Sequence, residues 1–328
     1  MGEFLYLAQF FLLRRNKMRE KRKFAERSRV LLNSEVRKKI YLVFEGEKTE
    51  ALYFEAIDAL KTELGMNPIL ELIPILRSYN ERGWSNPKKI LERIIRNLDE
   101  TKSGKYSYES FFNCILEFYD EHHKLSGGKV QKQSIWNSLV FICIQENQKK
   151  LSDIMEDLET EGIKILEKLA EKEKIINVAE HISEILQIQE LTYAEGFDKI
   201  CLIVDRDPLS FSEEQYDQVV QICKERQIDF YVTNPCFEFW LLLHFPDHKN
   251  LDPVKIKENS KVSSRSRYLE NELKKRCGSY QKYRYDAEDI VRRVDTAVIN
   301  STAYCVDINL LKNEIGSNLG TLIHELRT

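Results

Sequence analysis

The sequence predicts an α/β fold: a parallel sheet flanked by helices, interrupted by a helical insertion and followed by a mainly helical C-terminal region. Two observations carry this prediction. Short apolar runs alternate with amphipathic segments, and two of these runs, 40–44 and 200–204, end in acidic residues. Runs of this kind are typical of the buried strands of parallel sheets. With 328 residues and 42% apolar content, the chain is long enough to bury a sizeable core.

The charge balance and the cysteine content disfavour some classes of protein. The 50 basic and 53 acidic residues give a formal net charge of −3, so any affinity for nucleic acid must come from local basic patches. The seven cysteines are scattered, and none forms a C-x-x-C pair. This pattern is typical of reduced cytoplasmic thiols and argues against a disulfide framework or a cysteine-based zinc site.

Residues 1–35 are predicted to be an extension, apolar at first and then basic. The apolar stretch 4–13 is about half as long as the roughly twenty residues that span a bilayer. It also has the wrong charge order for a secretory signal, so we expect a cytoplasmic protein without a membrane anchor. Met18 is a candidate natural start. The basic run 14–29 is expected to be a solvated tail or to contact a phosphate backbone.

The main α/β domain is predicted over 36–245 and begins in the order strand, helix, strand, helix. The run 39–44 predicts a buried strand, and 49–60 predicts a helix with acids between its apolar positions. A strand follows near 70–76, broken by a proline. The next helix is predicted to begin at Asn86-Pro87, because asparagine caps a helix and proline at the first position loses no needed N–H.

A helical insertion is predicted over 99–196. Its apolar residues recur at helical spacing in four places: 111–118, 136–144, Leu151-Ile154-Met155-Leu158, and 163–169. The insertion is expected to be a hairpin or a small bundle, and one alternative use is an arm that binds a partner or clamps a substrate.

The strand–helix alternation then resumes. The sequence predicts a strand at 199–204, a helix at 213–226, a strand at 228–232 and a helix containing 237–244. The region 246–328 is expected to be mainly helical.

Acidic residues lie at the predicted ends of two strands. Glu45 precedes Gly46 at a strand-to-helix turn, where glycine lets the backbone bend and leaves the helix N-terminus open to a phosphate. Asp205 and Asp207 are two residues apart, so an extended backbone points both carboxylates to the same side. Functional groups collect at the carboxyl ends of parallel strands, and clustered carboxylates suit Mg²⁺ or Mn²⁺. The sequence therefore predicts a metal site at this edge.

Three phrases together resemble the RloB family, a branch of the Toprim nucleases related to the OLD-family nucleases. They are E-G-E-K-T-E at 45–50, D-R-D at 205–207 and N-P-C-F-E-F-W at 234–240. The resemblance covers about 36–100 and 197–300 and implies a Toprim-like sheet. It does not account for the helical insertion or the N-terminal extension.

The resemblance implies roles for the acids. Glu45, Asp205 and Asp207 match the strand-end glutamate and the D-x-D that act with a divalent metal on phosphodiesters, and so are both catalytic and metal-ligating candidates. Glu50 matches a residue that could hold a second ion, although an acid in the first helical turn is also favoured by the helix dipole. Glu238 is a candidate metal ligand or supporting acid, and it could equally cap its helix.

Two further residues have competing interpretations. Lys282 lies among Tyr280, Tyr283, Arg284 and Tyr285, a basic and aromatic cluster that could neutralise a scissile phosphate or stack on a base. It is therefore a candidate catalytic residue, but tyrosine-rich segments also pack without a ligand. His244 ends an apolar run and is predicted to pack rather than to catalyse.

The expected reaction is metal-assisted hydrolysis of phosphodiester bonds in DNA or RNA, including tRNA, with one or two Mg²⁺ or Mn²⁺ ions. No P-loop or G-x-S-x-G phrase competes for the site. The resemblance implies an anti-phage, abortive-infection role with a separate RloA-like ATPase of the AAA/ABC type. The sequence does not decide whether the protein forms a homo-oligomer. The alternatives are phosphodiester transfer of the primase or topoisomerase kind, and a non-enzymatic binding module with a structural metal ion.

Overall fold

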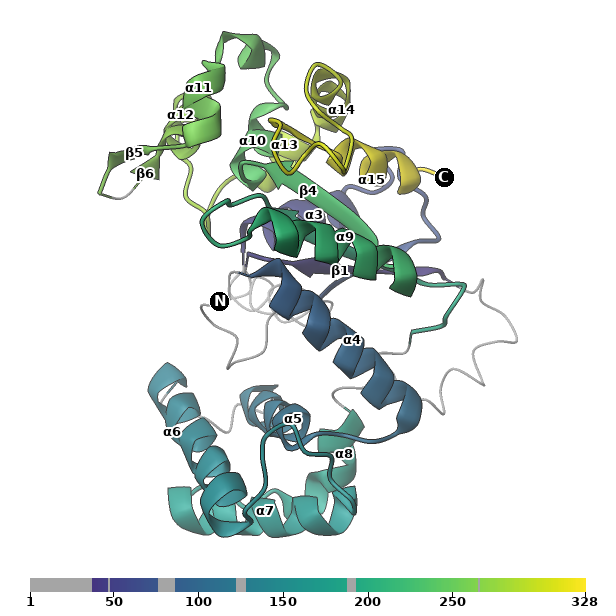
Figure 1. The fold of residues 1–328 in the computed structure, drawn as a ribbon, viewed down its shortest axis with the longest axis vertical. Coiled ribbons are helices and arrows are strands. Elements are labelled where there is room, and N and C mark those ends of the chain that lie inside the picture. Colours follow the sequence, from purple (N-terminus) through teal and green to yellow (C-terminus); the bar gives the residue numbers. More distant parts are fainter. Residues whose placement is uncertain (1–36, 47, 76–85, 122–127, 188–192, 265) are drawn as a thin grey trace, which may run out of the picture.

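The computed structural model describes residues 37–46, 48–75, 86–121, 128–187, 193–264 and 266–328 (Figure 1). The predicted extension over 1–35, with its apolar stretch and basic run, lies outside these residues. Within the described ranges, no helix is long and apolar enough to cross a membrane.

The predicted α/β fold is confirmed. Four parallel strands lie side by side in the order β2-β1-β3-β4, and a short fifth strand, β7, pairs with β4 in the antiparallel direction. Their bounds are β1 Lys39–Phe44, β2 Glu71–Ile75, β3 Lys199–Asp205, β4 Asp229–Asn234 and β7 Gly316–Ser317. Every side chain of β1 is buried, as expected for a strand covered on both faces.

Capping side chains fix where two of the helices begin. Helix α3, Thr49–Ala59, connects β1 to β2. Helix α4, Pro87–Ser103, begins after Asn86, whose side-chain oxygen accepts a hydrogen bond from the backbone N–H of Lys88. Helix α9, Glu213–Arg226, begins with a reciprocal capping box between Ser212 and Gln215.

Strand β2 is not broken by its proline, contrary to the sequence prediction. Pro74 lies inside the strand and is paired in register with Leu42 of β1. Proline lacks a backbone N–H and is therefore tolerated where no neighbour needs that donor. Because β2 is an edge strand, its missing donor faces away from the sheet.

The predicted insertion forms a helical unit with its own core, seen at the bottom of Figure 1 below α4. The buried cluster of this unit is drawn entirely from residues 108–185, with Phe111, Phe112, Phe118, Trp136 and Leu166 among its members. Its elements are α5 Tyr108–Glu121, α6 Gly128–Phe141, a π turn Ile142–Glu146, α7 Leu158–Glu173, a 3₁₀ turn Ala179–His181 and α8 Ile182–Gln187.

The predicted helix through Leu151 and Leu158 is wrong. Residues 147–157 form turns, and Ile154 makes an isolated bridge with Ser107. The side chain of Asp153 accepts a hydrogen bond from the N–H of Lys150, and Asp157 caps α7 by accepting from the N–H of Thr160. Aspartate competes with helical hydrogen bonding in this way, so the apolar spacing alone was misleading.

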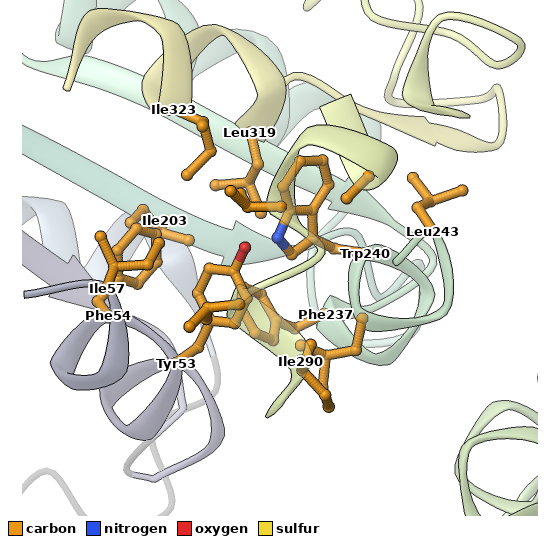
Figure 2. Close-up of a cluster of buried hydrophobic side chains, with 14 of the residues drawn as sticks. Tyr53, Phe54, Ile57, Ile203, Phe237, Trp240, Leu243, Ile290, Leu319 and Ile323 are labelled. Carbon is orange, nitrogen blue, oxygen red and sulfur yellow. The ribbon is translucent and has the colours of Figure 1, made fainter. Parts of the chain in front are cut away.

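The C-terminal region joins the same core as the sheet. Its elements are a 3₁₀ turn Pro246–Asn250, α11 Pro253–Glu258, β5 Lys261–Ser263, β6 Ser266–Arg267, α12 Tyr268–Cys277, α13 Ala287–Val291, α14 Val294–Ser301 and α15 Leu319–Glu325. In Figure 2, Ile290 and Leu319 from this region surround Tyr53 of α3 and Trp240 of α10, Phe237–Leu242. The predicted helical character is confirmed, and the short strands were not predicted.

His244 has the packing role that the sequence predicted. Its ring is fully buried, and its Nδ1 lies 3.1 Å from the carbonyl oxygen of Trp240. A carbonyl only accepts, so Nδ1–H is the donor, and Nε2 accepts from the hydroxyl of Tyr53 at 3.0 Å. Burial lowers the pKa of His244 to about 3, because the charged ring would lose its hydration.

We predict that this histidine makes the fold sensitive to acid. The unfolded chain binds a proton at about pH 6.5 and the folded chain does not, so the wild type should lose about 1.4 kcal/mol of unfolding free energy per pH unit below that value. Urea unfolding of the wild type and of His244→Gln at pH 7.5, 6.5 and 5.5 tests this. The difference between the two proteins should shrink as pH falls, and parallel pH profiles would contradict the prediction.

We also predict that the helical insertion is dispensable for folding of the remainder. The side chains of Lys102 and Glu195 form an ion pair at 2.8 Å, so the two ends of the insertion lie next to each other. Replacing residues 105–194 with a short Gly-Ser linker should therefore leave a folded protein with cooperative thermal unfolding by circular dichroism. Loss of all soluble protein would show that the insertion belongs to the main core.

Candidate functional site

The order in which the chain adds strands to the sheet reverses between β1 and β3. From β1 the chain moves through α3 to β2 on one side, and β3 then pairs on the other side of β1. Ligands bind in open α/β sheets outside the carboxyl ends of the strands at such a switch point. Glu45 directly follows β1 and Asp205 ends β3, so the topology brings these two predicted site residues to the same place.

Backbone hydrogen bonds fix both acids. The N–H of Glu45 donates to the carbonyl of Ile203 at 3.1 Å, and the N–H of Asp205 donates to Oε2 of Glu45 at 3.1 Å. Asp205 Oδ1 accepts a hydrogen bond from the backbone N–H of Phe237 at 2.8 Å. The carboxylates are thus held by rigid elements of three different segments.

Glu50 reaches the same place from the first turn of α3. Its side chain is 5% exposed, and its carboxylate lies directly against Gly46. A Cβ atom on Gly46 would collide with the carboxylate of Glu50, so glycine lets this side chain approach the backbone so closely. The sequence suggested that a phosphate could bind beside Gly46, but the carboxylate of Glu50 occupies this space.

Glu238 enters from the first turn of α10. It does not cap the helix: the N-cap residue is Cys236, and the carboxylate of Glu238 instead accepts from the hydroxyl of Tyr280 at 3.1 Å. Only 2% of Glu238 is exposed, and its Oε1 forms an ion pair with Nζ of Lys282 at 3.1 Å. Glu238 and Lys282, which the sequence predicted as site residues separately, are therefore in direct contact.

Lys282 is held over the acids by the loop that carries it. Its backbone carbonyl accepts from the hydroxyl of Thr49 at 2.7 Å, and the hydroxyl of Tyr285 donates to the carbonyl of Thr49 at 2.7 Å. Thr49 is the first residue of α3 and the neighbour of Glu50. Tyr280 and Tyr285 thus pack, as one interpretation of the sequence expected, and they place the lysine at the site, whereas Tyr283 is exposed.

We call Glu45, Glu50, Asp205 and Glu238 the acid cluster. Burial, and then the charges of Glu50, Glu45 and Glu238, raise the pKa of Asp205 well above its usual range. Burial alone would raise the pKa of Glu238 as well, but the ammonium of Lys282, together with hydrogen bonds to the carboxylate, outweighs burial and lowers that pKa. Burial lowers the pKa of Lys282, but the attractions of Glu238 and Asp205 and the hydrogen bond to Glu238 together outweigh it, and the pKa rises.

The donor set suits a hard cation in its chemistry, since carboxylate oxygens are the ligands that Mg²⁺ and Mn²⁺ prefer and the net charge is negative. As they stand, however, no three His, Cys, Asp or Glu side chains of the described residues form a group able to hold a metal ion. One oxygen each of Glu45 and Asp205 is hydrogen-bonded to a backbone N–H, and Lys282 neutralises Glu238. A cation would therefore have to draw the acids together.

Asp207 lies two residues beyond the end of β3. Its Oδ1 accepts from the N–H of Leu209 at 3.0 Å, and its carbonyl accepts from the N–H of Phe211 at 2.9 Å. It therefore shapes the turn after β3. The charges that act on Asp205 come from the other three acids and Lys282, and a ligand role for Asp207 remains a prediction.

Sequence reasoning assigned no role to Arg206 or Asn234. The buried guanidinium of Arg206 donates to the carbonyls of Lys312, at 2.9 Å, and Phe211, at 2.6 Å. The amide of Asn234 donates to the carbonyl of Leu311 at 2.7 Å. Both residues thus bind the same C-terminal segment, at Leu311 and Lys312. The only feature of the sequence that could have indicated this role was their position inside the D-R-D and N-P-C-F-E-F-W motifs.

The comparisons with known proteins give one finding. A family model described as RloB-like protein matches residues 40–326, which is most of the chain. No curated protein and no solved structure matches the chain.

We predict that Asp205→Asn stabilises the metal-free protein. The amide keeps an oxygen for the N–H of Phe237 but removes the charge that three carboxylates repel, so Tm in EDTA at pH 8 should rise by roughly 2–4 °C for each kcal/mol relieved. Asp207→Asn removes the same charge outside the acid cluster and should change stability by less than about 0.5 kcal/mol. A lower Tm for Asp205→Asn would show that the negative charge is needed for folding.

Proposed function

The chain belongs to the RloB-like family, and we propose that it is a metal-dependent nuclease that hydrolyses phosphodiester bonds of DNA or RNA. One observation carries the proposal. Acids from the ends of two adjacent parallel strands converge at the point where the strand order reverses, and their charges raise the pKa of Asp205 although Lys282 pairs with Glu238. Such a site suits a divalent cation and the phosphate that this cation would bind.

The residues would divide the work as follows. Glu45, Asp205 and Asp207 would hold Mg²⁺ or Mn²⁺, and Glu50 with Glu238 would complete the site or hold a second ion. The ion supplies activation of a water molecule and stabilisation of the leaving oxygen. Lys282, freed from Glu238 as the acids turn to the ion, would place its ammonium against a phosphate oxygen. No protein nucleophile is needed.

The proposal extends to a Toprim-type effector of anti-phage, abortive-infection defence that works with an RloA-like ATPase of the AAA/ABC type. The helical insertion is the natural docking element, because it is a separate unit that exposes apolar side chains. These are Phe141, Ile144, Ile154 and Ile176. A partner bound there would act on the nuclease through α4, since Arg96 of α4 forms an ion pair with Glu109 of α5 at 2.9 Å.

A non-enzymatic binding module is the second candidate. It is favoured by the absence, among the described residues, of an assembled group of three metal-ligating side chains, and by the ion pair that already neutralises Glu238. In that case the acid cluster would organise the fold, and the surface around it would carry the function.

We predict that Glu45→Gln and Asp205→Asn abolish cleavage and leave the fold intact. Each change removes a charged ligand from the end of a strand whose apolar residues stay in place. Purified proteins, with and without the neighbouring ATPase, are incubated with plasmid DNA and total RNA in Mg²⁺ or Mn²⁺. Thermal unfolding checks the fold.

Glu171→Gln is the matched control, because it removes one exposed glutamate from α7, in the separate helical unit. It should cleave like the wild type. Full cleavage by Glu45→Gln in the presence of metal would exclude the proposed metal site and move the binding module to first place.

A further inference from the structure

Positive charge is concentrated in one segment beside the acid cluster. Residues 249–285 contain eleven Lys or Arg and four Asp or Glu, a net charge of +7, and so the rest of the chain carries −10. The segment includes α11, the two-stranded ribbon of β5 and β6, α12 and the loop with Lys282. A local field of this sign attracts polyanions even on a protein of negative net charge.

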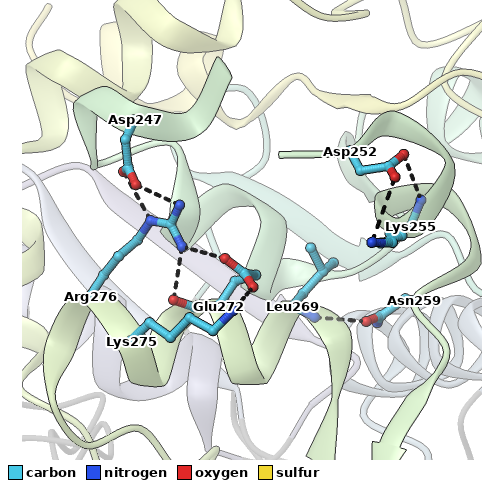
Figure 3. Close-up of polar contacts among 8 residues, drawn as sticks. All are labelled: Asp247, Asp252, Lys255, Asn259, Leu269, Glu272, Lys275 and Arg276. Carbon is cyan, nitrogen blue, oxygen red and sulfur yellow. Dashed lines mark hydrogen bonds and ion pairs between the residues drawn. The ribbon is translucent and has the colours of Figure 1, made fainter. Parts of the chain in front are cut away.

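Part of this charge is neutralised within the segment, and part is not. Figure 3 shows Arg276 bound by Asp247 and Glu272, Lys275 bound by Glu272, and Lys255 close to Asp252. Among the other cations, Lys257, Lys261 and Arg267 are exposed and form no ion pair with a carboxylate of the described residues.

These three cations lie on or beside the ribbon. Lys261 of β5 is directly opposite Arg267 of β6, and like charges opposite each other in a pair of strands destabilise it. The guanidinium of Arg267 donates to a neutral acceptor, the carbonyl of Asn259. The sequence thus keeps an unfavourable charge pair on an exposed ribbon, which a bound polyanion would relieve.

The ribbon is fixed to the acid cluster at its base. The buried amide of Asn259 donates to Sγ of Cys236 at 3.3 Å, and the N–H of Leu269 donates to the side-chain oxygen of Asn259 at 3.1 Å. Cys236 is two residues before Glu238. In the segment that follows β6, the carboxylate of Glu270 lies 3.8 Å from the ammonium of Lys282. The segment before β5 and the segment after β6 therefore each contact a residue at or next to the acid cluster.

An exposed tyrosine completes the surface. Tyr283 follows Lys282 and is 61% exposed, and the ammonium of Lys48 lies 5.7 Å from the centre of its ring. An exposed aromatic ring beside cations is the arrangement on which unpaired bases stack, while neighbouring lysines and arginines contact the phosphates. A base inside a duplex is already stacked on its neighbours and cannot use such a ring.

We propose that the β5–β6 ribbon and Tyr283 bind a single-stranded segment of nucleic acid and lead it to the acid cluster. The inference rests on the proposed nuclease function and names the form of its substrate. Lys257, Lys261 and Arg267 contact phosphates along the strand, and Tyr283 stacks on a base next to the phosphate that faces Lys282.

Binding is measured without cleavage, by fluorescence anisotropy of the full-length protein in EDTA. The probes are a labelled single-stranded oligonucleotide as DNA, the same sequence as RNA, and the corresponding duplex, each titrated at several salt concentrations. The variants are Lys257→Gln/Lys261→Gln/Arg267→Gln, Tyr283→Ala and Tyr283→Phe. The matched control is Lys105→Gln/Lys164→Gln/Lys224→Gln, which removes the same charge from exposed lysines elsewhere.

The wild type should bind the single strand more tightly than the duplex. The ribbon variant should lower the slope of log K against log salt by about two, since each phosphate contact to a single strand contributes about 0.7, and the control should keep the wild-type slope. Tyr283→Ala should weaken binding about fivefold or more, and Tyr283→Phe should restore it. The DNA and RNA probes distinguish the two possible substrates.

Equal binding by the ribbon variant and the control, or preference for the duplex, would overturn the inference. Failure of the nuclease proposal has a different signature: the wild type binds the strand through the ribbon but cuts neither DNA nor RNA in metal.

Discussion

The structure depends on holding like charges together at the end of the sheet. Glu45, Glu50, Asp205 and Glu238 are brought close by two adjacent strands and two helix starts, although their repulsion and burial disfavour the charged state, as the raised pKa of Asp205 shows. Backbone N–H groups and the ammonium of Lys282 are among the groups that offset this cost. A folded protein that keeps such an arrangement has a use for it, because replacing the acids with neutral side chains would be the simpler route to stability.

The same constraint explains why so much of the C-terminal region packs onto the sheet. Lys282 must be held over the acids, and its loop is fixed through Thr49 and Tyr285 to the first residue of α3. Helix α13 then packs against α3 and α14 against α10, the two helices whose first turns supply Glu50 and Glu238, while α15 packs against α14 and β4 (Figure 2). Catalytic geometry needs first-turn residues that do not move, and dense packing behind them is the physical means to that end.

Much of this arrangement was predictable from the sequence, and the rest was not for identifiable reasons. Buried parallel strands, and helices that begin at Asn86-Pro87 and Ser212, have local signals that survive folding. The turn at 147–157 imitates a helix in its apolar spacing, and only the aspartates that bind nearby N–H groups distinguish it. Strand β7 has two residues and no periodicity, so it exists only through pairing with β4. Glu45 and Asp205 were found from strand ends, whereas their link to Lys282 spans residues that no local pattern connects.

Charge is separated within one chain of nearly balanced composition. An acid cluster alone would repel a nucleic-acid backbone, and a cationic surface alone would bind the backbone without acting on it. Here the cations of 249–285 lie beside the acids, joined by Asn259 at Cys236 and by Glu270 at Lys282. Screening limits the reach of each charge to about 8–10 Å at physiological salt, so the two fields do not cancel at the surface although they nearly cancel in total. For the substrate that we propose, this separation, and not the net charge of −3, would decide which molecules the site admits.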